Sequence, residues 1–154
     1  MTTIIEGAHQ GQGIKVGIVV SRFNQFVTQV LLDRCLEILQ SSGVSESDIT
    51  VVWVPGAFEL PLMAEKLAKK SVHGVICLGA VIRGETSHFD YVCQESARGI
   101  SQVMLRTGKP VLFGVLTTET MEQALERASK DGENKGEDMA YALLEMVDGI
   151  KQIG

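Results

Sequence analysis

The sequence predicts an α/β fold, a three-layer αβα sandwich built on a four-stranded parallel sheet. Apolar, β-branched runs alternate along the chain with segments in which apolar residues recur at the helical period. The runs are apolar along their whole length, which is typical of parallel strands that helices cover on both faces. Four strand–helix units with right-handed crossovers give a sandwich of flavodoxin-like type.

Four strands are expected, and each is a run rich in valine and isoleucine. They span residues 14–20, 49–54, 74–82 and 110–117. Gly13 precedes the first strand, and the turn signal Pro55-Gly56 closes the second. Glycine and proline therefore mark where these β-branched runs begin or end.

Five helices are expected between and after the strands. They span residues 24–42, 58–70, 86–106, 119–129 and 135–150. Gly43 and Gly108 end the first and the third helix. Pro61 is compatible with the second helix because it falls in or near the first turn. The polar loop KDGENKG separates the last two helices.

Composition limits the classes of partner. The chain has 154 residues, a net charge of −5 and a pI of about 5.2, so nothing in its charge favours nucleic acid or an anionic membrane as a partner. No apolar run is long enough to span a bilayer, and the N-terminal stretch lacks the features of a signal peptide. We expect one domain over residues 1–154 and a cytoplasmic location.

The three cysteines and the N-terminal segment each support one expectation. Cys35, Cys77 and Cys93 are widely spaced in apolar segments, which predicts three buried, reduced thiols and no metal site.

Residues 1–13 form an arm before the first full strand. Its stretch TTII has strand character and no obvious partner in its own sheet, so we expect it to pair with a neighbouring subunit.

Ligands of open parallel sheets bind beyond the carboxyl ends of the strands. This rule singles out residues 21–24, 55–59, 79–88 and 114–119. The third stretch, GAVIRGETSH, places an Arg-Gly-Glu-Thr turn before a helix, where free backbone N–H groups form a natural phosphate cradle. A capped helix with a solvated turn is the simpler alternative.

His88 follows that turn and is the one candidate for proton transfer near neutral pH. A nucleophilic pair with Cys93 is disfavoured, because two side chains five residues apart on a helix point to different faces. Arg127 precedes the KDGENKG stretch and Lys135 lies near its end; together they form a candidate phosphate clamp, although two ordinary surface charges would look the same.

Phe23 and Phe58 are expected at strand ends, where loops are usually polar. An aromatic side chain there either packs at the edge of the core or offers a stacking platform for a planar ring. Residue chemistry alone leaves both alternatives open.

Several stretches together resemble the 6,7-dimethyl-8-ribityllumazine synthase family of riboflavin biosynthesis, in family order and with family spacing. They are SRFN (21–24), WVPGAFELP (53–61), LGAVIRGETSHFDYV (78–92), FGVLTTE (113–119), QALERA (123–128) and NKG (134–136). The resemblance implies a transferase that condenses 5-amino-6-(D-ribitylamino)uracil with 3,4-dihydroxy-2-butanone 4-phosphate, with no metal and no redox cofactor.

The resemblance also implies a role for each site residue. Residues expected to contact the uracil are Phe23, Asn24, Ala57, Phe58, Glu59, Ala80, Val81, Ile82, Phe113 and Lys135. Residues expected to hold the butanone phosphate are Gly84, Glu85, Thr86 and Arg127, with Lys135 nearby. His88 is the expected proton-transfer residue, and Phe113 is expected to reach the site of a neighbouring subunit. The Glu85 carboxylate is tolerable beside a phosphate only if it points away. Asp90 is expected to be a helix-surface carboxylate, and Arg83 receives no role.

Family members form homopentamers, and some assemble twelve pentamers into an icosahedral shell. This chain has no insertion between its last two helices, which favours the shell, and riboflavin synthase is a candidate protein partner. Two other functions stay open at this stage. One is the related archaeal-type riboflavin synthase, which needs no phosphate site, and the other is a non-catalytic flavin binder or container.

Overall fold

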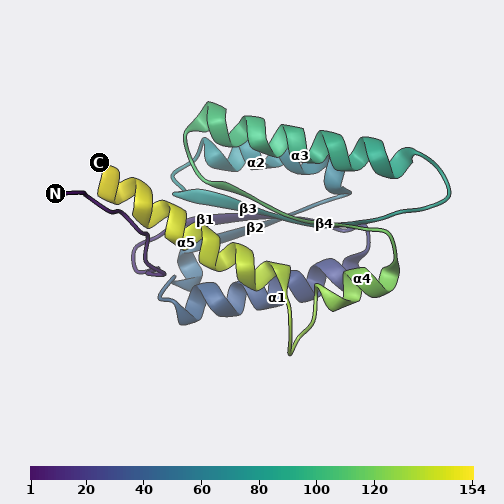
Figure 1. Cartoon of the computed structure of the whole chain (residues 1–154), viewed down its shortest axis with the longest axis horizontal. Helices are drawn as coiled ribbons and strands as arrows, with labels where there is room; N and C mark the ends of the chain where they lie inside the picture. Colours follow the sequence, from purple (N-terminus) through teal and green to yellow (C-terminus); the bar gives the residue numbers. More distant parts are fainter.

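A computed structural model describes residues 1–154, and its centre is one parallel sheet of four strands in the order β2-β1-β3-β4 (Figure 1). The strands are β1 (Val16–Ser21), β2 (Ile49–Val54), β3 (Gly74–Ile82) and β4 (Val111–Thr118). β3 is the longest strand, pairs with β1 and β4, and is buried along all but its last residue. The predicted fold class is confirmed.

Helices cover both faces of the sheet and give the three layers in Figure 1. They are α1 (Gln25–Ser41), α2 (Leu60–Ala68), α3 (His88–Thr107), α4 (Met121–Glu126) and α5 (Lys135–Ile153), with short 3-10 turns η1 (Glu46–Asp48) and η2 (Ala57–Glu59). α1 and α5 lie side by side on one face, and α2 and α3 lie side by side on the other. Each helix therefore buries one apolar stripe against the sheet.

Two hydrophobic clusters fill the spaces between the layers. On the α1/α5 face, Ile18 and Ile76 of the sheet pack with Leu31 and Leu143 of the helices. On the α2/α3 face the cluster includes Ile100 of α3 together with alternate residues of the strands. Because successive residues of a strand point to opposite faces, wholly apolar strands supply both clusters.

Nearly all predicted helix ends differ from the observed ones by one to three residues, and the differences in two helices bear on the candidate site. The helix expected over 119–129 is only Met121–Glu126, because Thr120 caps it and Ala128 leaves it for an isolated β-bridge with Asn134. The helix expected from Thr86 begins at His88, so residues 83–87 form an exposed loop. This loop carries the Gly-Glu-Thr turn.

The prediction of three buried thiols is correct for two cysteines and wrong for the third. Cys35 and Cys77 are fully buried, and burial raises the pKa of each thiol to about 12. Cys93 is only half-buried, because it lies on α3 toward the end that borders the loop. All three thiols are free.

The N-terminal arm lies along α5 and contains no strand within this chain. The Ala8 amide donates to the Asp148 carboxylate at 2.8 Å, which holds the pKa of Asp148 below its ordinary value. Before this contact the arm extends beyond the sheet with Ile4 81% exposed (Figure 1). Pairing of TTII with a neighbouring subunit stays a prediction. In the whole chain, no helix combines the length and apolar character needed to cross a membrane.

Candidate active site

A cavity of about 670 Å³ opens at the carboxyl ends of β1, β2 and β3. The order of the strands reverses direction between β1 and β3, and open α/β sheets bind ligands at such a point. Fifteen residues line the cavity and nine are hydrophobic, a composition and size typical of small-molecule sites. Of the four stretches that the strand-end rule singled out, residues 114–119 do not contribute, because they are at the end of β4, which lies on the far side of β3 from the reversal.

Ten residues expected at the site line this cavity. They are Phe23, Ala57, Phe58, Glu59, Ala80, Val81, Ile82, Gly84, Thr86 and His88. Pro55, Gly56, Phe89, Tyr91 and Val92 complete the lining and had no predicted role. Three segments far apart in the sequence thus meet at one end of the sheet.

Phe23 and Phe58 stand at the mouth of the cavity and not in the core. Their exposed fractions are 69% and 57%, which excludes the edge-of-core alternative within this chain. Below them the side chains of Ala57, Ala80 and Val81 are buried and small to medium in size. The cavity therefore combines buried apolar side chains with two exposed aromatic rings that are free to stack on a planar ligand.

Asn24 does not line the cavity, although the resemblance implied a contact with ligand. It adopts a left-handed conformation with φ of 61°, which asparagine tolerates better than most residues. Its side-chain amide donates to the Ala80 carbonyl at 2.9 Å. Asn24 therefore ties the start of α1 to β3 and fixes the backbone that presents Phe23.

The Gly84–Ser87 turn is exposed and makes few contacts of its own. A side chain at position 84 would meet nothing within 4 Å, so the backbone there is open to a ligand. The Thr86 hydroxyl faces the His88 amide at 3.4 Å, and the Asp90 amide donates to the Ser87 carbonyl. Glu85 is exposed and does not line the cavity, so its carboxylate makes no direct contact there.

Arg83 and Asp90 form an ion pair that the sequence did not predict. The guanidinium donates to Asp90 at 3.2 Å and to Glu119 at 2.6 Å, and it lies 4.4 Å from the centre of the Phe89 ring. Asp90 is therefore more than a helix-surface carboxylate. No local signal in the sequence reveals this cluster, because Glu119 is distant in the chain and reaches Arg83 only through the pairing of β3 with β4.

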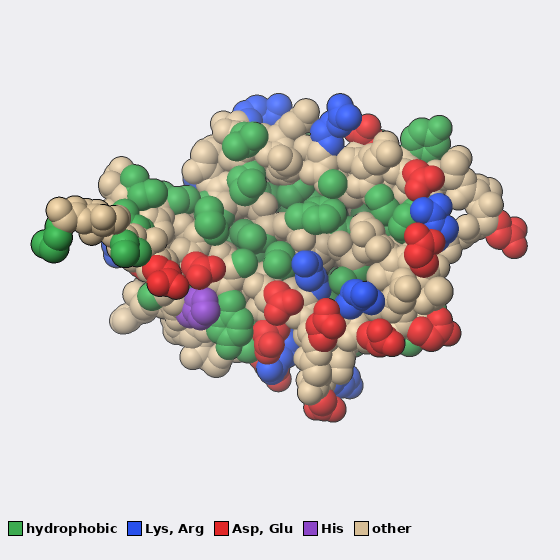
Figure 2. All heavy atoms as spheres, viewed as in Figure 1, with side chains coloured by type: hydrophobic (Ala, Val, Ile, Leu, Met, Phe, Trp, Pro, Cys, Tyr) green, Lys and Arg blue, Asp and Glu red, His purple; other side chains and the backbone are tan.

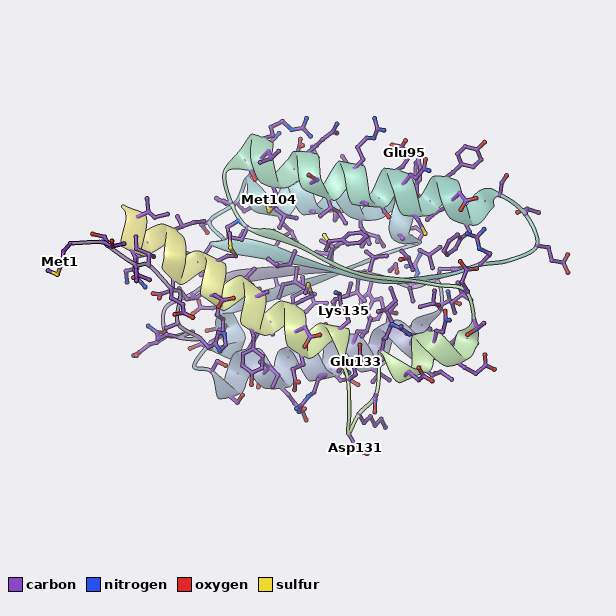
Figure 3. The ribbon with its side chains drawn as sticks, viewed as in Figure 1. Met1, Glu95, Met104, Asp131, Glu133 and Lys135 are labelled. Carbon is purple, nitrogen blue, oxygen red and sulfur yellow. The ribbon has the colours of Figure 1, made fainter.

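Besides Asn24 and Glu85, three more of the expected residues lie outside the cavity in this chain: Phe113, Arg127 and Lys135. Phe113 is on β4, the edge strand. The backbone amide of Lys135 donates to the Arg127 carbonyl at 2.9 Å, so the two cationic residues are neighbours where α4 ends and α5 begins. Figure 3 shows Lys135 at the start of α5, above a loop that carries Asp131 at its tip. Figure 2 shows basic side chains on this same face of the molecule, beside a hydrophobic area.

Residues 13–151 match the family model described as 6,7-dimethyl-8-ribityllumazine synthase. The chain belongs to this family. Lumazine synthases are transferases of riboflavin biosynthesis, so the match confirms the predicted family, reaction and enzyme class. The matched residues cover nearly the whole chain, from the start of β1 to the last turns of α5.

One lumazine-synthase stretch, NKG at 134–136, has a local physical explanation. The Asn134 side chain is buried and accepts hydrogen bonds from the amides of Gly136 and Glu137, so it caps α5. Gly136 lies against the Leu31 carbonyl of α1, and a Cβ at this position would stand 2.0 Å from that oxygen. Lys135 therefore lies between Asn134, which caps α5, and Gly136, which packs closely against α1.

Cys93 does not line this cavity. Burial and, secondarily, the Asp90 carboxylate raise the pKa of its thiol, which suppresses the thiolate that a nucleophile requires. These observations agree with the sequence argument against a pair with His88, which lines the cavity at the first residue of α3.

Proposed function

We propose that this protein condenses 5-amino-6-(D-ribitylamino)uracil with 3,4-dihydroxy-2-butanone 4-phosphate in the described cavity, releasing phosphate and water. The observation that carries this proposal is the meeting of two exposed aromatic rings, an open glycine turn and a histidine in one cavity. In this arrangement the uracil stacks on Phe23, with Phe58 beside it. Glu59 receives the ribityl hydroxyls, and the backbone of residues 80–82 contacts the pyrimidine edge.

The butanone phosphate is proposed to bind at the Gly84–Ser87 turn. Gly84 allows close approach of the backbone, and the Thr86 hydroxyl is within reach of a phosphate oxygen. The beginning of α3 adds free N–H groups and the positive end of a helix dipole. Glu85 contributes only its backbone, because its side chain lies outside the cavity.

The proposed chemistry uses positioning and proton transfer. The primary amine of the uracil condenses with the ketone to an imine and releases one water, phosphate is eliminated, and the second amine attacks the remaining carbonyl and closes the ring with loss of a second water. Holding the two substrates in register supplies a large part of the rate. His88 lines the cavity. It is proposed to stand between the two subsites and to add a proton-transfer contribution of ~10²–10⁴-fold at most.

The site is proposed to lie between subunits. Arg127 and Lys135 are adjacent to each other but not to the cavity of their own chain, and Phe113 lies on the edge strand. A phosphate dianion needs cations, and the cavity lining contains no lysine or arginine. A second copy that presents its Phe113, Arg127 and Lys135 to this cavity would supply the missing charge.

A homopentamer is the proposed assembly, because a ring of identical heterologous interfaces places each cavity against a neighbour's cations. Exposed apolar side chains support extensive subunit contact: Leu105 of α3 and Ile153 of α5 are 79% and 73% exposed. Ile4 of the arm adds a further apolar side chain for pairing with a neighbour. We also propose the icosahedral shell, and riboflavin synthase as a protein partner. The free thiols accord with a cytoplasmic location.

Sedimentation of the native protein is expected to give the mass of a pentamer or of twelve pentamers. The monomer has a mass of 16.7 kDa, so the two assemblies differ widely from it and from each other. A monomer that remained fully active would contradict the site between subunits, and a fully active dimer would contradict the pentamer.

The pure protein, given both substrates, is expected to produce a fluorescent lumazine and one free phosphate per lumazine formed. The rate must exceed that of the slow uncatalysed condensation. Because the proposed reaction needs no metal, the chelator EDTA is expected to leave the rate unchanged. Parallel fluorescence and phosphate assays measure both products, and a rate no higher than in the protein-free control would exclude the proposed reaction.

A further inference from the structure

Arg83 occupies the junction between β3 and the loop that is proposed to hold phosphate. Its backbone amide donates to the Thr118 carbonyl at 2.9 Å, which extends the pairing of β3 with β4 by one residue. The loop then runs through the Gly84–Ser87 turn to His88, the first residue of α3. The turn is exposed, and the few hydrogen bonds it makes are local. Its conformation therefore depends on how its two ends are held.

The Arg83 side chain joins both ends of this loop and a third element. Its Nε donates to Glu119 at the end of β4, and its Nη2 donates to Asp90 in the first turn of α3. The guanidinium also lies over the ring of Phe89, which is 9% exposed and lines the cavity beside His88. Exposed ion pairs taken singly contribute little. Here the carboxylates of Glu119 and Asp90 and the ring of Phe89 all contact the planar Arg83 guanidinium. These three contacts together restrict the orientation of the guanidinium.

We propose that Arg83 is a positioning residue for the synthase reaction, which keeps the Gly84–Ser87 turn and the start of α3 in the geometry that binds the phosphate substrate. This inference rests on the proposed function for its choice of substrate. Arg83 does not line the cavity, so it acts through the turn, Phe89 and His88 and does not touch the ligand.

The test is the variant Arg83→Met, which keeps an apolar stem and removes the guanidinium. We expect the KM for the butanone phosphate, and the inhibition constant of inorganic phosphate, to rise together by roughly three- to tenfold. The KM for the uracil is expected to stay unchanged, because the aromatic rings belong to other elements. Arg83→Lys, which keeps the charge but loses the planar fork, is expected to recover part of the loss. The matched control is Arg98→Met on the exposed side of α3.

A second variant, Glu119→Gln, tests the same cluster in case Arg83→Met does not fold. Glu119→Gln leaves Arg83, Asp90 and Phe89 in place and is expected to raise the same KM by a smaller factor. In Arg83→Met, hydrogen–deuterium exchange is expected to be faster than in wild type at the amides of residues 84–90 and nowhere else. Unchanged phosphate parameters, or equal changes in both KM values with a lowered melting temperature, would overturn the proposal.

These experiments distinguish failure of the proposed reaction from failure of the proposed role of Arg83. A wild-type protein that makes no lumazine would remove the proposed function. The role of Arg83 in shaping the loop would then be decided by the exchange rates and by calorimetric binding of inorganic phosphate. Equal exchange rates and equal phosphate affinity in wild type and Arg83→Met would reject it.

Discussion

Replacing Arg127 by alanine is expected to raise the KM for 3,4-dihydroxy-2-butanone 4-phosphate by roughly 10–100-fold, since hydrogen bonds to a charged group contribute about 1.5–3 kcal/mol. The uracil KM is expected to change little. Arg127 is half-buried, and its Nη1 donates to the Gln123 carbonyl at 3.0 Å, so one edge of the guanidinium is already oriented by the end of α4. Steady-state kinetics with each substrate varied in turn measures both effects.

Two further variants, Arg98→Ala and Arg127→Lys, serve as controls for Arg127→Ala. Arg98→Ala removes an exposed arginine from α3 and is expected to leave both KM values unchanged. Arg127→Lys keeps the charge without the bidentate fork and is expected to fall between wild type and Arg127→Ala. An unchanged KM in Arg127→Ala would remove Arg127 from the phosphate site.

The same variant tests whether the site lies between subunits. In the proposed site, Phe23 belongs to the subunit that contains the cavity and Arg127 belongs to its neighbour. Phe23→Ala therefore impairs one side of the interface, and Arg127→Ala impairs the other. In an equal mixture reassembled at random, about a quarter of the interfaces join two intact faces. The mixture should therefore be more active than either parent. A mixture that equals the mean of its parents would place both residues in one subunit's site.

Replacing Gly136 by alanine is expected to destabilise the protein by about 3 kcal/mol, at the upper end of the range for overpacked sites. The new Cβ would stand 2.0 Å from the Leu31 carbonyl oxygen, and backbone atoms cannot turn aside as a flexible side chain can. α5 must then move away from α1, the pair that closes one face of the core. The apparent melting temperature is expected to fall by roughly 6–12 °C for a chain of this length.

Gly149→Ala provides the matched control in the same helix. A Cβ at position 149 would meet nothing within 4 Å, and alanine has the higher helix propensity. This variant is expected to keep or slightly raise the melting temperature. Both variants are compared at one protein concentration, because assembly shifts apparent stability. Equal melting temperatures for Gly136→Ala and wild type would contradict the close approach of α1 and α5.

The sequence predicted the sheet and most helix positions well, because local patterns determine them. Runs such as GVICLGAVI are short, β-branched and apolar throughout, which is typical of a strand covered on both faces. The end of α4 was less predictable, since Ala128 leaves the helix for a bridge with Asn134 after a tight turn. The start of α3 was also missed, because Thr86 and Ser87 are both acceptable helix-capping residues.

By itself the sequence determined the fold class, the family and the end of the sheet at which the cavity lies. Strand-end geometry follows from parallel pairing, so residues after β1, β2 and β3 had to meet. Only the tertiary structure decided which side chains face the cavity. It placed Phe23 and Phe58 at the mouth and left Arg127 and Lys135 outside. It also joined Arg83 to Glu119, which lies 36 residues further along the chain. Such contacts depend on how distant layers pack, and periodicity within one segment carries no information about them.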